Sequence, residues 1–476
     1  MSKNVPIPVM AGVYVDDKPD VRVALPYNMV PVPGQEGVAD GYLRQADGIS
    51  LLGTGPGVDR GGHVWDGVHY RVMGTRLVSV SATGMVTDIG DVGGTGPVRL
   101  ANSFDRLGIV SNGFLWLYDG ATLLKVTNVN IPANLIDGVW IDGYWIVTDG
   151  EDMAASTLAD PEIFNADSYS GTDRPDPIKA LLKINNELHV VSRSFIDVFQ
   201  NSGDSTGFPF KRVNGAVITK GALGTRTACV FNNTVALLGC GTSAGNPDQK
   251  EVPSVYAAAN ASTVRIASME VDRTLAGYTE DELADAFVEA VIDIGCELLF
   301  IHLPDRTLVY DAIASAKSQY PVWHVRGSGL DDFSRYRAHY ITRAFGAWVV
   351  ADPDSEALGV WDPTQSQHYG EVSRWEFHTG MLRNGTKGAV MHKLSLLGLT
   401  GVVASGSGIS TAHTEDGVNY SMERYVSSGE AGERKKRIEW RKLGNWHGYR
   451  IQRFRGDSGS RLAVLSVDAE ISPLRY

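Results

Sequence analysis

The stretch Glu297–Asp311, Glu-Leu-Leu-Phe-Ile-His-Leu-Pro-Asp-Arg-Thr-Leu-Val-Tyr-Asp, decides the fold class. Two runs of β-favouring apolar residues, Leu298–Leu303 and Thr307–Tyr310, flank the pair Pro304-Asp305. Proline presets φ at the second position of a turn and aspartate hydrogen-bonds its own backbone, so the stretch predicts a β-hairpin. Neither run alternates apolar with polar residues, and both faces of the hairpin should therefore be covered by further β-structure.

Similar units of apolar strand, tight turn and apolar strand recur along the chain. We place their turns at Met73-Gly74, Asn112-Gly113, Asp142-Gly143, Asn185-Asn186, Asn232-Asn233, Pro304-Asp305 and Phe345-Gly346. Most intervals are about 40 to 47 residues, which is the period of a four-stranded propeller blade. The repeat of Gly-Thr-Gly-Pro at Gly53–Pro56 and Gly94–Pro97 supports this register. The alternative is an unrelated series of hairpins in stacked sheets.

These patterns predict an all-β protein with a β-propeller-like body and a C-terminal β-sandwich. We expect an irregular N-terminal segment at 1–45, where Pro6, Pro8, Pro26, Pro31 and Pro33 interrupt any long element. The propeller-like domain is expected at 46–363. Gly/Ser-rich turns between strands after about residue 363 predict a sandwich at 364–476.

Two departures from the hairpin pattern are expected inside the propeller-like domain. The polar segment at about 151–176 predicts an insertion loop. One short helix is predicted at about 280–291, because Thr279 and Glu282 form a capping box and Leu283, Phe287 and Val291 recur at helical spacing.

The composition limits the class of protein. The 53 glycines suit a chain rich in turns, while a formal charge of −12 disfavours a protein whose main task is to grip nucleic acid. The dispersed Cys229, Cys240 and Cys296 predict buried thiols rather than disulfides or a zinc site. We expect neither a signal peptide nor a transmembrane segment, and we expect a chain made in the cytoplasm.

Several sequences imitate functional motifs, and for each a structural role is the stronger interpretation. The loops at Gly53–Gly57 and Gly93–Pro97 lack the Gly-Lys-Ser/Thr of a phosphate-binding loop. Asp352–Glu356 lacks the glycine and final glutamate of a calcium loop. His302 is expected to be a hydrogen-bonded core residue. We therefore predict no catalytic residue, no metal site and no cofactor.

Two further segments have a structural and a functional interpretation. Thr414–Tyr420 resembles the Asp-box turn of sialidase-like propellers, in which the aspartate caps a hairpin and the aromatic residue packs beneath it. The basic cluster Glu433–Arg437, followed by Arg441-Lys442, is interpreted first as a charged edge strand. Its functional interpretation is a contact with an acidic partner surface or with DNA phosphate.

An ordered series of short segments is similar to the packaged-DNA stabilisation proteins of short-tailed bacteriophages, also called tail-hub or nozzle proteins. The strongest part comprises Pro253–Tyr256, Ile266–Ser268, Tyr278-Thr279 with Glu282, His302–Pro304, Leu308–Ala312, Trp323, Gly329-Leu330 and Tyr336-Arg337. Weaker matches are Asn28-Met29, Gly41–Arg44, Gly48-Ile49, Trp440, Gly444 and Arg450. Asp47 stands where the family tends to have proline.

The resemblance implies a non-enzymatic protein of the phage tail, assembled in the host cytoplasm. Such proteins form a hexameric ring below the portal and the head-to-tail adaptor and carry the needle and the tailspikes or tail fibres. They extend and close the channel through which double-stranded DNA passes without sequence-specific binding, and they retain the packaged genome until ejection. An acidic lumen would repel DNA rather than bind it.

Two other functions stay open at this point. A propeller enzyme acting on host glycans, such as a glycoside hydrolase or lyase, needs a pocket with convergent carboxylates. A carbohydrate-binding tail fibre commonly trimerises through long repetitive or coiled segments, and the chain has no sustained heptad repeat.

Overall fold

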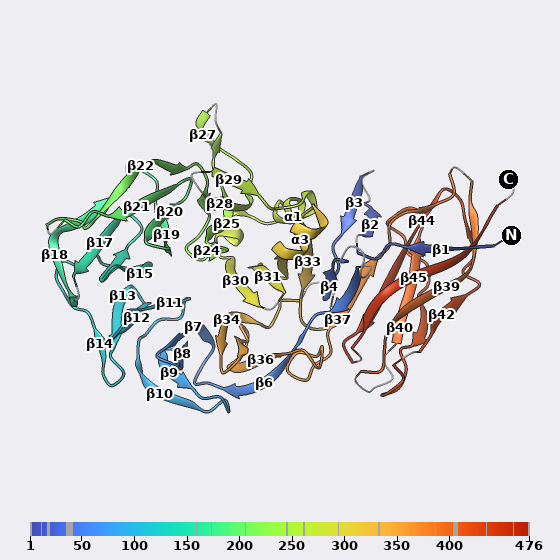
Figure 1. Cartoon of the computed structure of the whole chain (residues 1–476), viewed down its shortest axis with the longest axis horizontal. Coiled ribbons are helices and arrows are strands. Elements are labelled where there is room, and N and C mark those ends of the chain that lie inside the picture. Colours follow the sequence, from blue (N-terminus) through green and yellow to red (C-terminus); the bar gives the residue numbers. More distant parts are fainter. Residues whose placement is uncertain are drawn as a thin grey trace.

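The computed structural model describes residues 2–474 apart from 11, 17–19, 35–40, 159, 173, 205, 244–245, 260–261, 294, 332–333, 386, 403–407, 435 and 460. Figure 1 shows a ring of sheets followed by a separate β-domain, with both termini at the far end of that domain. This arrangement confirms the predicted all-β class, with a propeller body and a C-terminal sandwich.

The described residues of the ring form seven antiparallel sheets, the blades. The first blade has β7 (Asp59–Trp65), β8 (Val68–Met73), β9 (Arg76–Val80) and β10 (Val86–Asp91), the second has β11 (Arg99–Asn102), β12 (Leu107–Ser111), β13 (Phe114–Tyr118) and β14 (Leu123–Lys125), and the third has β15 (Asp137–Ile141), β16 (Tyr144–Thr148), β17 (Asp152–Thr157) and β18 (Asp160–Gly171). The fourth blade has β19 (Ile178–Ile184), β20 (Glu187–Ser192), β21 (Ile196–Asn201) and β22 (Phe210–Ile218), and the fifth has β23 (Gly221–Ala222), β24 (Ala228–Phe231), β25 (Thr234–Cys240), β28 (Ser254–Ala259) and β29 (Ser262–Arg265). The sixth blade has β30 (Phe287–Asp293), β31 (Cys296–His302), β32 (Thr307–Asp311) and β33 (Val322–Arg326), and the seventh has β34 (His339–Ala344), β35 (Ala347–Ala351), β36 (Ala357–Asp362) and β6 (Gly48–Thr54).

The ring closes on itself. The inner strands contact one another in the order β7, β11, β15, β19, β24, β30, β34 and again β7. The last blade takes its outer strand from the beginning of the chain, because β6 pairs with β36, with Trp361 opposite Ile49. An N-terminal strand thus fastens the C-terminal end of the propeller, and the alternative of unrelated stacked hairpins is wrong.

The quoted hairpin shows why the blades need one another. It forms β31 and β32, which pair with each other through Phe300 opposite Val309. Successive side chains of a strand point to opposite faces. Leu299 and Ile301 accordingly enter the buried cluster shared with the fifth blade, whereas Leu298 and Phe300 enter the cluster shared with the seventh. Each seam between neighbouring blades holds a similar cluster, so every blade covers its neighbours.

The predicted turns are confirmed. Each joins two paired strands, and the two-residue turns place Asn112, Asn232 and Phe345 at positive φ. The repeated Gly-Thr-Gly-Pro segments lie at equivalent places, where the outer strand of one blade leads into the inner strand of the next, and Gly53 and Thr54 are the last residues of β6.

Two predictions inside the propeller are wrong. The segment at 151–176 is not an insertion loop but contains β17 and β18, and it is polar because β18 is an outer strand whose side chains are mostly exposed. The helix at 280–291 stops early: α2 is Glu280–Ala284, and Phe287 and Val291 belong to β30. Its capping box between Thr279 and Glu282 is confirmed.

The prediction of one short helix is also wrong. The described residues contain α1 (Met269–Leu275), α2 and α3 (Ala312–Ser318), all short. Ser268 caps α1 and Asp311 caps α3 through bonds to backbone N–H groups. The β26 (Thr242–Ser243) and β27 (Asn246–Lys250) pair forms a small hairpin that projects from the fifth blade (Figure 1).

The C-terminal domain is a sandwich of two sheets. One sheet has the order β4 (Met29–Val32), β5 (Tyr42–Gln45), β45 (Ala463–Pro473), β39 (Ala389–Leu399) and β42 (Ile438–Arg441), with β1 (Lys3–Ile7) on β45 and β43 (Asn445–Trp446) on β39. The other has β37 (Arg374–His378), β44 (Tyr449–Asp457), β40 (Gly408–Thr414) and β41 (Arg424–Ser427), with β38 (Leu382–Arg383) on β44. A separate hairpin of β2 (Gly12–Val15) and β3 (Val21–Ala24) lies beside the sandwich.

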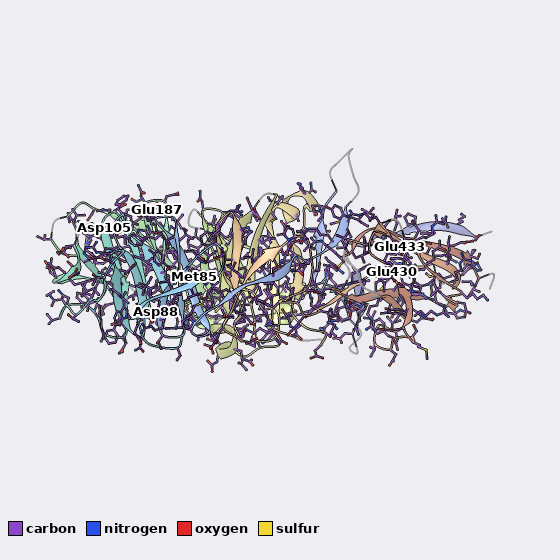
Figure 2. The ribbon with its side chains drawn as sticks, turned by 90° about the horizontal axis from the view of Figure 1, so that it is seen from below. Met85, Asp88, Asp105, Glu187, Glu430 and Glu433 are labelled. Carbon is purple, nitrogen blue, oxygen red and sulfur yellow. The ribbon has the colours of Figure 1, made fainter. Side chains whose placement is uncertain are left out.

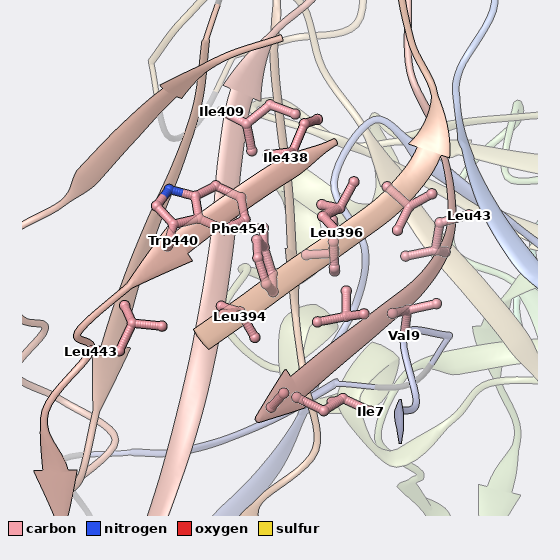
Figure 3. Close-up of a cluster of buried hydrophobic side chains, with 14 of the residues drawn as sticks. Ile7, Val9, Leu43, Leu394, Leu396, Ile409, Ile438, Trp440, Leu443 and Phe454 are labelled. Atoms are coloured by element: carbon pink, nitrogen blue, oxygen red, sulfur yellow. The ribbon is translucent and has the colours of Figure 1, made fainter. Parts of the chain in front are cut away.

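The prediction of an irregular segment at 1–45 is wrong, because this segment completes the sandwich. Ile7, Val9 and Leu43 are buried with Leu394, Leu396, Ile438, Trp440 and Phe454 in one core (Figure 3). Pro6 lies in β1 and Pro31 in β4, the terminal strand of its sheet. Proline is tolerated in such strands because its missing N–H would face outward.

Candidate functional site

The Asp-box-like segment forms the tip of the β40–β41 hairpin of the sandwich. Asp416 Oδ1 accepts bonds from the backbone N–H groups of Val418 (2.9 Å) and Asn419 (2.8 Å), and the Thr414 hydroxyl donates to the same oxygen (2.9 Å). Bonds from Asn419 and Val418 hold the pKa of Asp416 well below its ordinary value. The aspartate therefore caps a turn, as predicted.

The calcium-like segment is also a turn, between β35 and β36. Asp352 is buried, and its Oδ2 accepts bonds from Arg337 Nε (2.9 Å) and the Ser355 hydroxyl (2.6 Å). Asp354 pairs with Arg335 at 3.0 Å. Protein donors already occupy these carboxylates, which gives them a structural role.

His302 is buried, and both of its ring nitrogens have protein partners. Nδ1 lies 3.0 Å from the Thr307 hydroxyl, and Nε2 lies 2.8 Å from Glu289 Oε1. The His339 ring lies 4.0 Å away, and burial together with His302 lowers its pKa well below the ordinary value. The pair is a buried polar layer within the sixth and seventh blades, in agreement with the core role predicted for His302.

The loop at Gly93–Pro97 is organised by a buried arginine. Arg60 donates from Nε to Gly96 O (2.6 Å) and from Nη1 to Gly93 O (2.7 Å) and Gly74 O (2.9 Å). The loop points carbonyl oxygens, not N–H groups, at the Arg60 guanidinium in its centre, whereas a phosphate-binding loop needs N–H groups that point inward.

No group of three or more His, Cys, Asp or Glu side chains among the described residues is placed to hold a metal ion. No helix of that part of the chain is long and apolar enough to span a membrane. The three cysteines are free, but only Cys240 is buried, so the prediction of buried thiols is wrong for Cys229 and Cys296, which are partly exposed.

A single carboxylate ties four inner strands together near the propeller axis. Asp137, at the start of β15, is fully buried and accepts bonds from Arg99 Nε (2.6 Å) and Nη2 (3.0 Å) and from the Leu181 backbone N–H (2.8 Å). Arg226 lies in the chain just before β24, and its Nη1 atom is 3.7 Å from Asp137 Oδ1. Four consecutive blades therefore converge within contact distance of one side chain, which leaves no room for a DNA duplex along the axis of one subunit.

The electrostatics of this group depend on the pairing. Burial raises the pKa of Asp137, but the charges and hydrogen bonds of Arg99 and the charge of Arg226 bring it below the ordinary value. Burial and the neighbouring Arg99 lower the pKa of Arg226 to about 10, and Asp137 opposes that shift. Removing the carboxylate would leave two arginines facing one another.

The joint between the two domains is centred on Asn28. Its side-chain Nδ2 donates to Gly327 O (2.9 Å) of the propeller and to Arg374 O (2.6 Å) of the sandwich, and its Oδ1 accepts from the Gly327 N–H (3.1 Å). Its own backbone N–H donates to Val325 O at 2.8 Å. The neighbouring Tyr27 exchanges two backbone bonds with Glu376 of the sandwich, so this short segment hydrogen-bonds to both domains.

The chain also crosses the joint twice. It runs from β5 of the sandwich into β6 of the propeller, and later from β36 of the propeller into β37 of the sandwich. Asp47, at the first crossing, pairs with Arg44 (2.8 Å) and Arg461 (2.7 Å). Two covalent connections and the Asn28 bonds restrict the rotation that a single linker between domains would permit.

The two domains carry opposite charge. Residues 46–363 contain 39 Asp and Glu against 23 Lys and Arg, a net charge of −16. Residues 1–45 and 364–476, which form the sandwich, contain 16 Asp and Glu against 20 Lys and Arg, a net charge of +4. Of the basic cluster, Arg441 lies in β42, the terminal strand of its sheet, whereas Glu433, Arg434, Lys436 and Arg437 precede that strand, so the interpretation as a charged edge strand holds only in part.

The sequence matches two related domain families. Residues 5–366 match the family described as Bacteriophage P22 Gp10, beta-propeller, and residues 374–472 match Bacteriophage P22 Gp10, beta-sandwich. The chain belongs to this family. It is 27% identical over 469 residues to the tail hub protein gp10 of Salmonella phage P22, covering 92% of this chain and 93% of that protein.

Solved structures that share part of the fold have much lower sequence identity to this chain. The N-terminal domain of Nup159 is 9% identical with a TM-score of 0.40 and covers 71% of this chain and 98% of its own. The Pan2 WD40 domain of Neurospora crassa is 9% identical with a TM-score of 0.42 and covers 67% and 96%.

Of the two residues that tie distant parts of the chain together, Asn28 was part of the family resemblance in the sequence and Asp137 was not. Asn28-Met29 is part of the resemblance, and Asn28 proves to be the bridge between the domains. The positive φ of Asn28, 50°, suits asparagine. Asp137 gave no signal, because nothing in the sequence near it indicates which distant arginines it meets.

Proposed function

We propose that this chain is a structural component of the tail hub of a short-tailed phage. The observation that carries the proposal is similarity to the P22 tail hub protein over 92% of the chain, extending through both domains. In this proposal the chain forms an oligomeric ring, hexameric in the simplest case, below the portal and the adaptor. It holds the packaged genome until ejection and carries needle and spike or fibre proteins.

The mechanics of the subunit support this proposal. A wall that holds pressurised DNA must transmit force between its parts without hinging. Doubled covalent connections at the joint, the Asn28 bridge and the propeller fastened by β6 all resist separation of the parts. The proposal assigns no chemistry to the chain, in keeping with the structural roles of Asp352, Asp416 and His302.

The charge and the axis support a conduit between subunits. Because four blades converge on Asp137, DNA must run outside each propeller, in a lumen formed by several copies. The propeller's −16 charge suits a lumen wall that repels phosphates, since a wall rich in cations would bind DNA through counterion release.

The test is a reconstruction of the virion tail together with particles made without this chain. We expect density for a ring of this chain below the adaptor, an acidic channel wall, and particles that package DNA but lose it when the chain is missing. A tail without the chain, a channel lined by lysine and arginine, or full genome retention in its absence would each contradict the corresponding part of the proposal.

A further inference from the structure

The second and third blades share an aromatic and acidic pocket of about 690 Å³. Phe104, in the turn after β11, is 91% exposed and meets Trp140 of β15 edge to face, with ring centroids 5.2 Å apart. Asp105 and Asp142 flank these rings, Lys183 also lines the pocket, and Asp105 pairs with Arg106 at 3.1 Å. The Ser103 hydroxyl accepts the Arg106 N–H (2.9 Å), which fixes the turn that presents Phe104.

The chemistry of this Phe104 pocket suits a cation. Lys183 Nζ already lies 5.0 Å from the Trp140 ring, so this ring is accessible to a positive charge. Residues 126–173 contain nine Asp and Glu and no Lys, Arg or His. Glu162 is exposed beside Pro161, which lines the pocket. An exposed aromatic face among carboxylates attracts a guanidinium or ammonium group.

The sandwich carries a surface of complementary character. A groove of about 720 Å³ is lined by the basic patch, which we define as Lys393, Leu397, Leu399, Arg434, Arg437 and Leu465. The three leucines are 58%, 43% and 49% exposed, in that order. Lys393, Arg437 and the adjacent Arg441 all approach the single carboxylate of Glu439, at 3.6, 3.5 and 3.3 Å, so positive charge remains in excess.

These two surfaces lie toward opposite ends of the molecule. Figure 1 places β18 of the acidic blade at one end and β39 and β42 of the sandwich at the other. Figure 2 shows Asp105 and Glu433, next to Arg434, separated along the same axis. The surfaces of one chain therefore cannot meet each other.

We propose that the basic patch of one copy docks on the Phe104 pocket of the next copy, so that subunits join head to tail. A cation of the patch sits against Phe104 and Trp140 between Asp105 and Asp142, and the exposed leucines are covered at the same time. A contact between two different surfaces of identical chains closes into a ring when the rotation between neighbours permits it. This inference names the subunit contact of the proposed tail hub and rests on that function for its biological setting only.

Charge decides between this occupant and a glycan. An aromatic platform beside carboxylates can also stack on a sugar, but a neutral sugar gives no counter-charge to the carboxylates of Asp142, which lines the pocket, and Glu162, which is exposed beside it. A basic partner uses them, and the chain itself supplies one on the sandwich. Glycan binding is accordingly an outcome of the test that counts against the proposal.

The first experiment uses the full-length chain in about 50 mM salt, where charge interactions are weakly screened. We expect concentration-dependent association in sedimentation, weakened as salt is raised. Zero-length carbodiimide cross-linking should join Lys393 of one copy to Asp105, Asp142 or Glu162 of another. A chain that stays monomeric over the whole concentration range, or cross-links confined to other surfaces, would overturn the proposal.

Charge reversal provides the sharper test. Asp105→Lys with Glu162→Lys, or Arg434→Glu with Arg437→Glu, should each weaken association at least ~100-fold. The chain that carries all four substitutions has both charges exchanged and should regain association to within ~10-fold of the wild type. Failure of this rescue in a folded four-substitution chain would refute the pairing.

Matched variants control for general effects of charge and apolar area. Glu356→Lys and Arg383→Glu change exposed residues of the two domains outside the proposed contact and should leave association unchanged. Phe104→Ala should weaken association ~10-fold, whereas Met85→Ala, which also removes an exposed apolar side chain, should not. Phe104→Ala removes an exposed side chain, so it remains informative if a reversal variant fails to fold.

The outcomes separate this inference from the proposed function. Association through these surfaces by a chain that is missing from virion tails would leave the contact standing and refute the tail-hub role. A tail ring in which copies meet through other surfaces would support the tail-hub role and refute the proposed contact. Binding to a glycan panel that Phe104→Ala abolishes, without self-association, would overturn the docking proposal.

Discussion

Replacement of Asp137 by alanine tests whether one carboxylate stabilises the propeller axis. The substitution removes two bonds from Arg99 and one from the Leu181 N–H, and leaves Arg226 beside Arg99 without a negative charge between them. Breaking a fully buried pair costs about 3–5 kcal/mol. The Arg99 side chain is 26% exposed, so we expect water to offset part of that and the free energy of unfolding to fall by about 2–4 kcal/mol.

Two further variants separate charge from shape. Asp137→Asn keeps the size of the side chain and an acceptor for the Leu181 N–H, so its cost should be about half that of Asp137→Ala. Asp66→Asn changes an exposed turn residue at a φ of 49° that asparagine tolerates, and should cost less than about 0.5 kcal/mol.

The assay is urea unfolding followed by tryptophan fluorescence and by far-ultraviolet circular dichroism, with hydrogen exchange of peptides from each domain to assign the transitions to the propeller or the sandwich. Circular dichroism spectra in buffer must match before the midpoints are compared. Equal stability of Asp137→Ala and Asp66→Asn would refute the idea that this carboxylate holds the blades together.

Acid should remove the same contribution. The folded-state pKa of Asp137 is below its unfolded value, so its stabilisation is fully present above the unfolded pKa of about 3.9 and is lost as pH falls through the folded pKa. The stability difference between the wild type and Asp137→Asn should therefore be constant from neutral pH to about pH 5 and shrink below about pH 4. A difference that grows on acidification would contradict the assignment.

Three predictions concern the joint, the sandwich and metals. Asn28→Ala should lower the free energy of unfolding by about 2–4 kcal/mol and expose the joint to limited proteolysis. Asn28→Gly loses the same side-chain hydrogen bonds but adopts the positive φ without strain, so its loss of stability measures the contribution of those bonds alone. Leu43→Ala should cost the sandwich about 2–5 kcal/mol because Leu43 is fully buried in its core, and a change limited to the propeller transition would contradict that placement. Chelation with EDTA should leave the thermal midpoint unchanged, and a drop of several degrees would reveal a stabilising metal.

The sequence predicted the repeated hairpins because their signals are local. Pro304-Asp305 and the Asn-Gly and Asp-Gly pairs fix turn conformations within four residues, and apolar runs on both sides show that both faces need cover. The capping box of Thr279 and Glu282 is local in the same way. Its continuation as a helix through Val291 failed because Phe287–Asp293 gains more by pairing with β31 than by a helical stripe, and no local pattern reports that partner.

The chain alone thus determined the all-β class, the turns and the acidic net charge of −12, since each depends on residues close together or on simple counts. Only the tertiary structure decided that residues 1–45 complete the sandwich, that β6 fastens the propeller, and that Asn28 and Asp137 bind partners far away in sequence. The reason is physical. The role of a polar group buried at a joint or an axis depends on which groups folding brings beside it. A linear pattern of residue types does not contain those distances.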